Sequence, residues 1–95
     1  MATLVDLAER YGLNLLLRRY ADQDNRWTAS FEHCETKESL HSSVLASTYG
    51  SGKSPREALN DYAKQIAGKY LVGWALSPTM RREHRMPETI EPWKD

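Results

Sequence analysis

The fold is decided by residues 44–76, which read VLASTYGSGKSPREALNDYAKQIAGKYLVGWAL. Ser54 is a suitable N-cap for a helix, Pro55 suits the first helical position, and Glu57 can accept a hydrogen bond from the amide of the cap residue. Apolar side chains then recur at helical spacing and form one stripe, namely Ala58, Leu59, Tyr62, Ala63 and Ile66. Gly68 supplies the left-handed residue on which such a helix ends. We therefore predict a strand, a glycine turn, a capped helix and a second strand.

The part of the chain before this stretch has the pattern of a short helix followed by a β-hairpin. Residues 3–11 carry apolar side chains at helical spacing and end at Gly12, and residues 13–20 then read as an extended strand. The polar residues 22–25 predict a turn, because such side chains bond their own backbone. Residues 26–34 alternate, which predicts a half-buried strand. Its apolar face consists of Trp27, Ala29, Phe31 and His33, and its polar face of Thr28, Ser30 and Glu32.

The remaining segments complete a two-layer α+β sandwich. A polar turn is predicted at residues 35–39, a third strand at 40–49 and a fourth strand at 70–76. The order is then helix, three strands, helix and strand, which makes an antiparallel sheet of about four strands with one main helix. We expect a single domain over residues 1–76. Three prolines interrupt residues 77–95, which predicts an extended Pro- and Arg-rich tail that lies on the domain or extends from it.

Composition narrows the classes of function. The chain has 95 residues, enough for one modest core, and its 13 basic and 13 acidic residues cancel at pH 7. A protein without net charge has no overall attraction for a polyanion, so nucleic-acid binding would require a local basic patch. Cys34 is the single cysteine, which is typical of a reducing compartment. The first residues do not resemble a secretory leader, and no apolar run approaches the ~20 residues that span a bilayer. We expect a cytoplasmic protein without a membrane partner.

The segment GSGKS at residues 50–54 invites comparison with a phosphate-binding loop. The full pattern requires a glycine where this chain has Ser47, and Pro55 removes an amide from the first helical turn. Such loops also belong to parallel sheets, which this chain is too short to build. We therefore favour a turn that leads into the helix cap, and we retain an anion contact at Lys53 and Arg56 as a candidate binding site.

The residues that could perform chemistry do not form a recognisable motif. His33, Cys34, Glu35 and His41 are possible metal ligands, but they lack the two spaced ligand pairs of a structural zinc site. Cys34 with a histidine also lacks any sign of an oxyanion site or an activating base. The sequence therefore predicts no catalytic residue, no metal, no cofactor and no small-molecule substrate, and we expect that the protein is not an enzyme.

Positive charge is concentrated in the C-terminal tail, at Arg81, Arg82 and Arg85. Arginine beside exposed methionine or aromatic side chains is typical of an interface anchor or a phosphate contact, so these residues are the principal candidates for partner binding. An equally weighted alternative is a solvated tail that packs Met86, Ile90 and Trp93 onto the sheet. A second basic surface is predicted at the strand edge that carries Arg18, Arg19 and Arg26.

The run from Tyr49 to Val72 resembles a segment of small bacteriophage and prophage proteins. The shared features are a YGxG turn, a Pro-x-Glu-Ala helix start, an Asp-Tyr-Ala helix centre and an Ile-x-Gly-Lys end. Small single-domain phage proteins include anti-CRISPR proteins, which act without catalysis by occupying a surface of a guide-RNA effector complex. The resemblance implies a phage-encoded inhibitor that binds a host protein or ribonucleoprotein in the cytoplasm of the host cell.

A second resemblance is to the βββα-type fold of HicB antitoxins and, more loosely, to double-stranded-RNA-binding domains. HicB-like chains also run from a strand through a polar turn into a helix with a Glu-Ala start. The resemblance implies an alternative function as a small RNA-binding or toxin-neutralising module. The basic residues on the helix of this chain are Lys53, Arg56 and Lys64, fewer than a double-stranded-RNA-binding domain requires.

Overall fold

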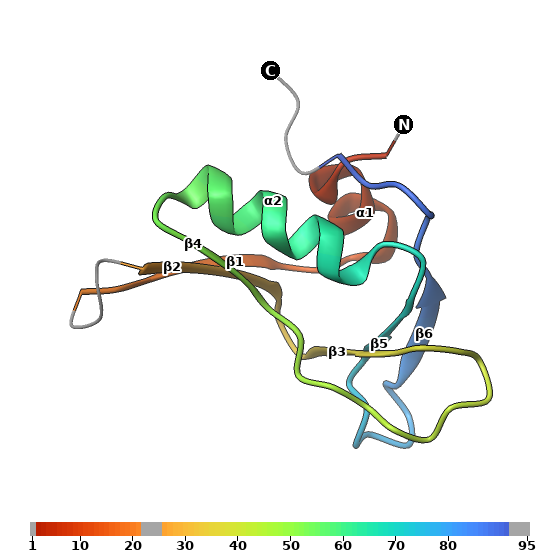
Figure 1. Cartoon of the computed structure of the whole chain (residues 1–95). Helices are drawn as coiled ribbons and strands as arrows, with labels where there is room; N and C mark the ends of the chain where they lie inside the picture. Colours follow the sequence, from red (N-terminus) through yellow and green to blue (C-terminus); the bar gives the residue numbers. More distant parts are fainter. Residues whose placement is uncertain (1, 22–25, 92–95) are drawn as a thin grey trace.

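The structure is a computed structural model, and it describes residues 2–21 and 26–91. Within these residues the chain forms two helices and six strands in two antiparallel sheets, ordered β1-β2-β4 and β3-β5-β6 (Figure 1). The elements are α1 (Leu4–Tyr11), β1 (Leu15–Tyr20), β2 (Arg26–Phe31), β3 (Cys34–Lys37), β4 (Gly50–Gly52), α2 (Pro55–Ile66), β5 (Tyr70–Gly73) and β6 (Arg82–Arg85). The predicted α+β class is confirmed, with two three-stranded sheets in place of one larger sheet. The predicted turn at residues 22–25 and the predicted packing of Trp93 lie outside the described residues.

Both helices begin as their sequences indicate. At α1, the Thr3 hydroxyl accepts from the Asp6 amide at 3.1 Å, and the Asp6 carboxylate accepts from the Thr3 amide at 2.9 Å. At α2, the Ser54 hydroxyl accepts from the Glu57 amide at 3.1 Å. The Glu57 carboxylate reaches the amide of Lys53 at 2.8 Å, one residue before the cap. The predicted Ser54 cap is confirmed, and the reciprocal bond is shifted by one residue.

The core lies between α2 and the β1-β2-β4 sheet, and α1 closes one end of it. The predicted apolar stripe of α2 is buried along its whole length, and so are Ala29 and Phe31 on the predicted inner face of β2. Tyr62 lies at the centre: its hydroxyl accepts from the Phe31 amide at 3.0 Å, and its ring meets the Phe31 ring edge-on. Helix α1 contributes Leu4 and Leu7, both with no exposed surface. The sequence therefore predicted this face of the fold correctly.

The predicted glycine turn at residues 50–53 is wrong, because Gly50–Gly52 is strand β4, antiparallel to β2. Helix α2 packs directly on the backbone of this strand. A Cβ atom at Gly50 would stand 2.3 Å from the Ala58 carbonyl oxygen and 2.3 Å from the Tyr62 nitrogen. A Cβ at Gly52 would stand 2.4 Å from the Glu57 Cβ. The glycines thus permit close contact between a helix and a strand, and they do not form a phosphate-binding loop.

The predicted strand over residues 26–34 and the predicted turn over 35–39 are also wrong in their boundaries. Strand β2 ends at Phe31, because His33 adopts a left-handed conformation with φ of 61° and directs the chain into the second sheet. Strand β3 then occupies Cys34–Lys37 and pairs with β5. Its polar residues are tolerated because they have partners: the buried Lys37 ammonium lies 2.6 Å from the Glu83 carboxylate of β6. A polar segment was therefore mistaken for a turn.

The predicted strand over residues 40–49 is wrong as well. Before β4 this segment forms only an isolated bridge between Ala46 and Thr36 of β3. Its apolar residues Leu40 and Val44 are exposed, so burial does not hold the segment in a sheet. The predicted strand over 70–76 is shortened to β5, because Trp74 takes a left-handed conformation with φ of 53°.

The C-terminal segment lies on the body of the protein and supplies a strand of the second sheet. Strand β6 pairs with β5 at the sheet edge, and Met86 and Ile90 beyond it are buried. Glu91 lies beside the N-terminal segment, since its carbonyl oxygen accepts from the Leu4 amide at 3.1 Å. His84 of β6 stacks on Tyr11 of α1, with ring centroids 3.9 Å apart. Among the described residues, no helix combines the length and apolar character that crossing a bilayer requires.

The ion pair of the second sheet leads to a pH prediction. Hydrogen bonds from Lys37 and Arg81 hold the pKa of the Glu83 carboxyl below its usual range. The ionised form is therefore stabilised by folding, so the contribution is present above the unfolded pKa and is lost as the pH falls through the folded pKa. We expect Glu83→Gln to lower the melting temperature at neutral pH, and the gap to close as both proteins are acidified. A gap that is constant with pH would show that Glu83 acts through packing alone.

Candidate partner-binding groove

The arginines predicted to bind a partner lie in or directly before the edge strand β6, and each has a partner within the chain. Arg81 forms two hydrogen bonds with the Glu83 carboxylate, at 3.1 and 2.9 Å. Arg82 donates to two backbone carbonyl oxygens of the preceding residues, and Arg85 pairs with Glu88. The three guanidinium groups are exposed, but their charge is partly compensated locally. Their role in binding stays a prediction.

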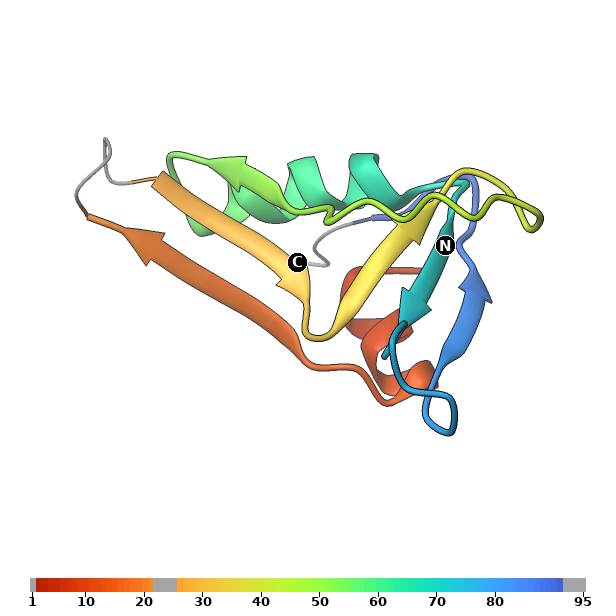
Figure 2. The same cartoon turned by 90° about the horizontal axis from the view of Figure 1, so that it is seen from below.

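The other two predicted residues, Lys53 and Arg56, do not join this cluster. They are exposed at the start of α2, at the opposite end of the molecule from β6 (Figures 1 and 2). The Glu57 carboxylate already accepts from the Lys53 amide, which reduces the attraction of the helix start for an anion. Lys53 follows Gly52, which is paired with Trp27, so Lys53 lies at the end of the sheet where β2 begins.

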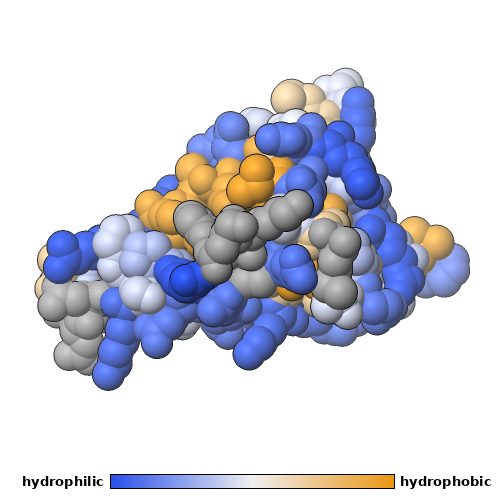
Figure 3. Space-filling view, turned by 90° about the horizontal axis from the view of Figure 1, so that it is seen from above, coloured by the Kyte–Doolittle hydropathy of each residue, from blue (hydrophilic) through white to orange (hydrophobic). Residues whose placement is uncertain are grey.

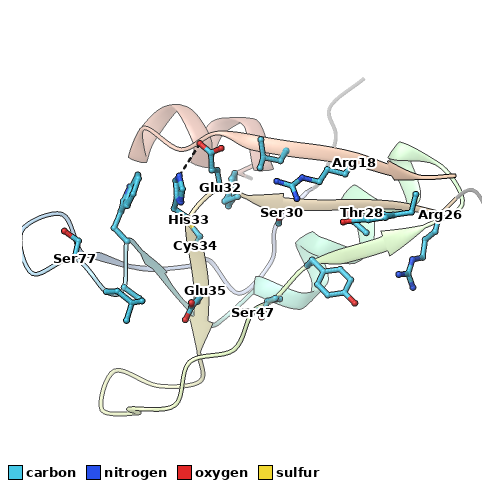
Figure 4. Close-up of a pocket in the computed structure, with 18 residues that line it drawn as sticks. Arg18, Arg26, Thr28, Ser30, Glu32, His33, Cys34, Glu35, Ser47 and Ser77 are labelled. Atoms are coloured by element: carbon cyan, nitrogen blue, oxygen red, sulfur yellow. Dashed lines mark ion pairs between the residues drawn. The ribbon is translucent and has the colours of Figure 1, made fainter. Parts of the chain in front are cut away.

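A groove of about 1170 Å³ lies on the face of the β1-β2-β4 sheet that α2 leaves uncovered. Its floor is formed by alternate residues of β1 and β2, which pair across the strands as Leu16 with Ser30, Arg18 with Thr28, and Tyr20 with Arg26. Its walls come from residues 47–49 and 74–77 and from the turn between β2 and β3. Figure 4 shows these segments converging, with Arg18, Thr28 and Ser30 side by side on the sheet.

The two ends of the groove carry opposite charge. Arg26 lies at one end, and Arg18, which is paired with Thr28, lies nearer the middle of the floor. Glu32 and Glu35 lie at the other end (Figure 4). The Nε atom of Arg26 is buried and has no hydrogen-bond partner among the described residues. Leaving a buried donor unsatisfied is costly, so a rearrangement of the Arg26 side chain that brings this donor to an acceptor would be favourable. At the other end, Glu32 accepts from the Asn14 amide group at 3.2 Å.

Exposed aromatic and apolar side chains border the same groove. The exposed members are Tyr20, Tyr49, Trp74 and Leu76, and Leu76 is 98% exposed. The Trp74 ring stacks on the His33 ring with centroids 3.9 Å apart, and the Trp74 amide donates to the His33 carbonyl oxygen at 2.8 Å. Two residues in left-handed conformations therefore hold each other in place beside the groove. Tryptophan, tyrosine and arginine are the residues that most often carry binding energy at protein interfaces.

Cys34 borders the groove but is not an activated thiol. Burial raises its pKa to about 11, so the thiolate that would act as a nucleophile or metal ligand is disfavoured at neutral pH. Within residues 2–21 and 26–91, no three His, Cys, Asp or Glu side chains are grouped closely enough to hold a metal ion. The neighbouring His33 is engaged in its stack with Trp74.

A second exposed feature lies on the opposite face, which carries the two helices. Figure 3 shows apolar side chains gathered into a patch on that face. Leu17 belongs to this side, because it is paired with Ala29 of the core, and it is 41% exposed.

The floor of the groove could have been recognised in the sequence. The alternation of β1 and β2 places Leu16, Arg18 and Tyr20 opposite the core face, together with Thr28 and Ser30, and the structure confirms this. The walls could not have been recognised, because residues 74–77 were predicted partly as strand and partly as tail. The pairing of β3 with β5, which sets Gly73 opposite Cys34, and the contact between Trp74 and His33 bring that wall to the sheet.

Comparison of the chain with protein-family models, with curated proteins and with solved structures gives no match.

Proposed function

We propose that the protein is a non-catalytic, phage-encoded inhibitor that binds a host nucleoprotein complex. The most specific candidate for its target is a CRISPR effector. The observation that carries this proposal is the gathering of arginine and exposed aromatic side chains around one open groove. Large amphipathic side chains held rigidly at a surface supply contact area at little entropic cost. The resemblance of residues 49–72 to small phage and prophage proteins supports the phage origin.

An alternative is a small RNA-binding or HicB-like toxin-neutralising module. The specific observation in its favour is that β1, β2 and β4 form an antiparallel sheet that leads directly into α2, which is the βββα succession of that class. Strand β3 leaves this succession to join the second sheet. Fold-level likeness of this kind supports an architecture more strongly than a function.

The proposal can be tested with purified CRISPR effectors of several types, each loaded with a guide RNA. We expect the chain to bind at least one type and to prevent its target-DNA binding or cleavage. Reversing the groove charges with Arg18→Glu and Arg26→Glu should weaken that inhibition about tenfold or more, equivalent to ~1.4 kcal/mol. The single variant Arg18→Glu should leave the melting temperature nearly unchanged, because the Arg18 charge is exposed and exposed charges contribute little to folding. Because Arg26 is half-buried, the melting temperature of the double variant is measured beside its inhibition.

The matched comparison is Arg81→Glu with Arg82→Glu, which makes the same change of charge on the other sheet. Loss of inhibition in that variant, with the groove variant still active, would move the interface to β6. Failure to bind or inhibit any effector type would overturn the proposed target. Tight binding to free double-stranded RNA or to a HicA-type toxin would favour the alternative.

A further inference from the structure

The groove has a length and a direction that restrict what can occupy it. Arg26 and Phe31 are the ends of β2, and five residue steps of ~3.3 Å separate them by about 17 Å. Glu32 is the next residue, so the backbone positions of Arg26 and Glu32 are at most about 20 Å apart, a distance spanned by about six extended residues. The uncompensated donor of Arg26 marks one end, and the exposed Trp74 and Leu76 stand near the other.

A single-stranded nucleic acid complements only one end of this groove. Arginine and exposed tyrosine suit phosphates and bases at the Arg18 and Arg26 end. A nucleic acid carries a negative charge at every nucleotide, however, and would bring phosphates against Glu32 and Glu35 at the other end. A polypeptide can carry different charges at its two ends and apolar side chains between them, so it complements the whole groove.

We infer that the groove binds an extended polypeptide segment that places acidic side chains on Arg18 and Arg26, apolar side chains against Trp74 and Leu76, and a basic side chain by Glu32 and Glu35. This inference rests on the proposed function, because it names the protein component of the partner as the part recognised. A carboxylate is the acceptor that matches the planar guanidinium donors of Arg18 and Arg26. Opposite charges at the two ends also fix the direction of the bound segment.

The test uses the whole chain and fluorescein-labelled peptides of about ten residues, long enough to span the groove. Each peptide has a glutamate-rich half, a leucine pair and a lysine-rich half, and it is made in both sequence orders. The comparison probes are the same peptide with glutamate at every charged position and an oligouridine of similar length. We expect one order of the bipolar peptide to bind at least about tenfold more tightly than either comparison probe. When this peptide binds, the amide NMR signals of the protein should shift in β1, β2 and residues 74–77.

The decisive variant is Arg18→Glu with Arg26→Glu, which should reverse the preference toward a peptide that carries lysine at every charged position. The matched control, Arg10→Glu with Lys64→Glu, makes the same change of net charge on the helices and should leave the preference intact. Tighter binding of oligouridine, amide shifts away from the groove, or an unchanged preference in the groove variant would each overturn the inference. Peptide binding without inhibition of any effector would sink the proposed function alone. Inhibition that depends on the groove, with oligouridine preferred, would sink the inference alone.

Discussion

Replacing Gly50 with alanine is expected to destabilise the protein strongly, although it adds only a single methyl group. The new Cβ would stand 2.3 Å from two backbone atoms of α2 and 2.6 Å from the Tyr62 Cβ. Backbone atoms cannot rotate away, so the helix must move off the sheet. That movement separates the Tyr62 hydroxyl from the Phe31 amide, which donates a hydrogen bond to it at 3.0 Å. Overpacking of this kind costs typically 1–3 kcal/mol, and because helix backbone is displaced here we expect at least about 3 kcal/mol in urea unfolding.

Gly73→Ala is the matched control for this change. Gly73 is also in a strand, but a Cβ there would meet the Cys34 sulfur at 3.7 Å and a carbonyl oxygen at 4.0 Å, which are ordinary contacts. Alanine also restricts the unfolded chain, so this variant should lie within about 1 kcal/mol of the parent. Equal unfolding midpoints for the two variants would mean that α2 does not rest on the backbone of β4.

Helix α2 and the two glycines of β4 show which features could be predicted from the sequence and which could not. Helix α2 was predictable because its cap, its proline and its apolar stripe are all local signals within residues 54–66. The role of Gly50 and Gly52 was not predictable, because a glycine in a turn and a glycine under a helix look alike in the sequence. Only the close packing of α2 on the backbone of β4 distinguishes a glycine under a helix from a glycine in a turn.

Strand β3 was missed for a related reason. Polar residues normally indicate exposed turns, and the segment from Cys34 to Lys37 contains mostly polar residues. In the structure Lys37 is buried because its ammonium group has the Glu83 carboxylate at 2.6 Å and the Leu40 carbonyl oxygen at 2.9 Å. The carboxylate belongs to strand β6, which is far from β3 in the sequence. No pattern within residues 34–37 could therefore predict this ion pair.

The candidate site, too, could be predicted from the sequence only in part. The alternation of residues 26–34 correctly placed Thr28 and Ser30 on the face away from the core, and the pairing of β1 with β2 sets Arg18 beside Thr28. Lys53 and Arg56 at the helix start were expected to assist the tail arginines in binding, but the start of α2 and strand β6 lie at opposite ends of the molecule (Figures 1 and 2). Charge reveals which side chains are available for binding, whereas topology decides which of them act together.

The second large effect is expected when the apolar stripe of α2 is shortened. Leu59 is 1% exposed and Ile66 is fully buried, so Leu59→Ala or Ile66→Ala leaves a cavity in the core. Such truncations cost ~2–5 kcal/mol, a large part of the ~5–15 kcal/mol that stabilises a domain.

Leu76 provides the matched control, because it is the same residue type with 98% of its surface exposed. Leu76→Ala removes the same atoms without creating a cavity and should change the free energy of unfolding by less than about 0.5 kcal/mol. Urea unfolding of the three variants measures these differences directly. If Leu59→Ala and Ile66→Ala unfold at the same midpoint as Leu76→Ala, the stripe of α2 does not face the core, and the packing that positions the groove on the opposite side of the sheet must be revised.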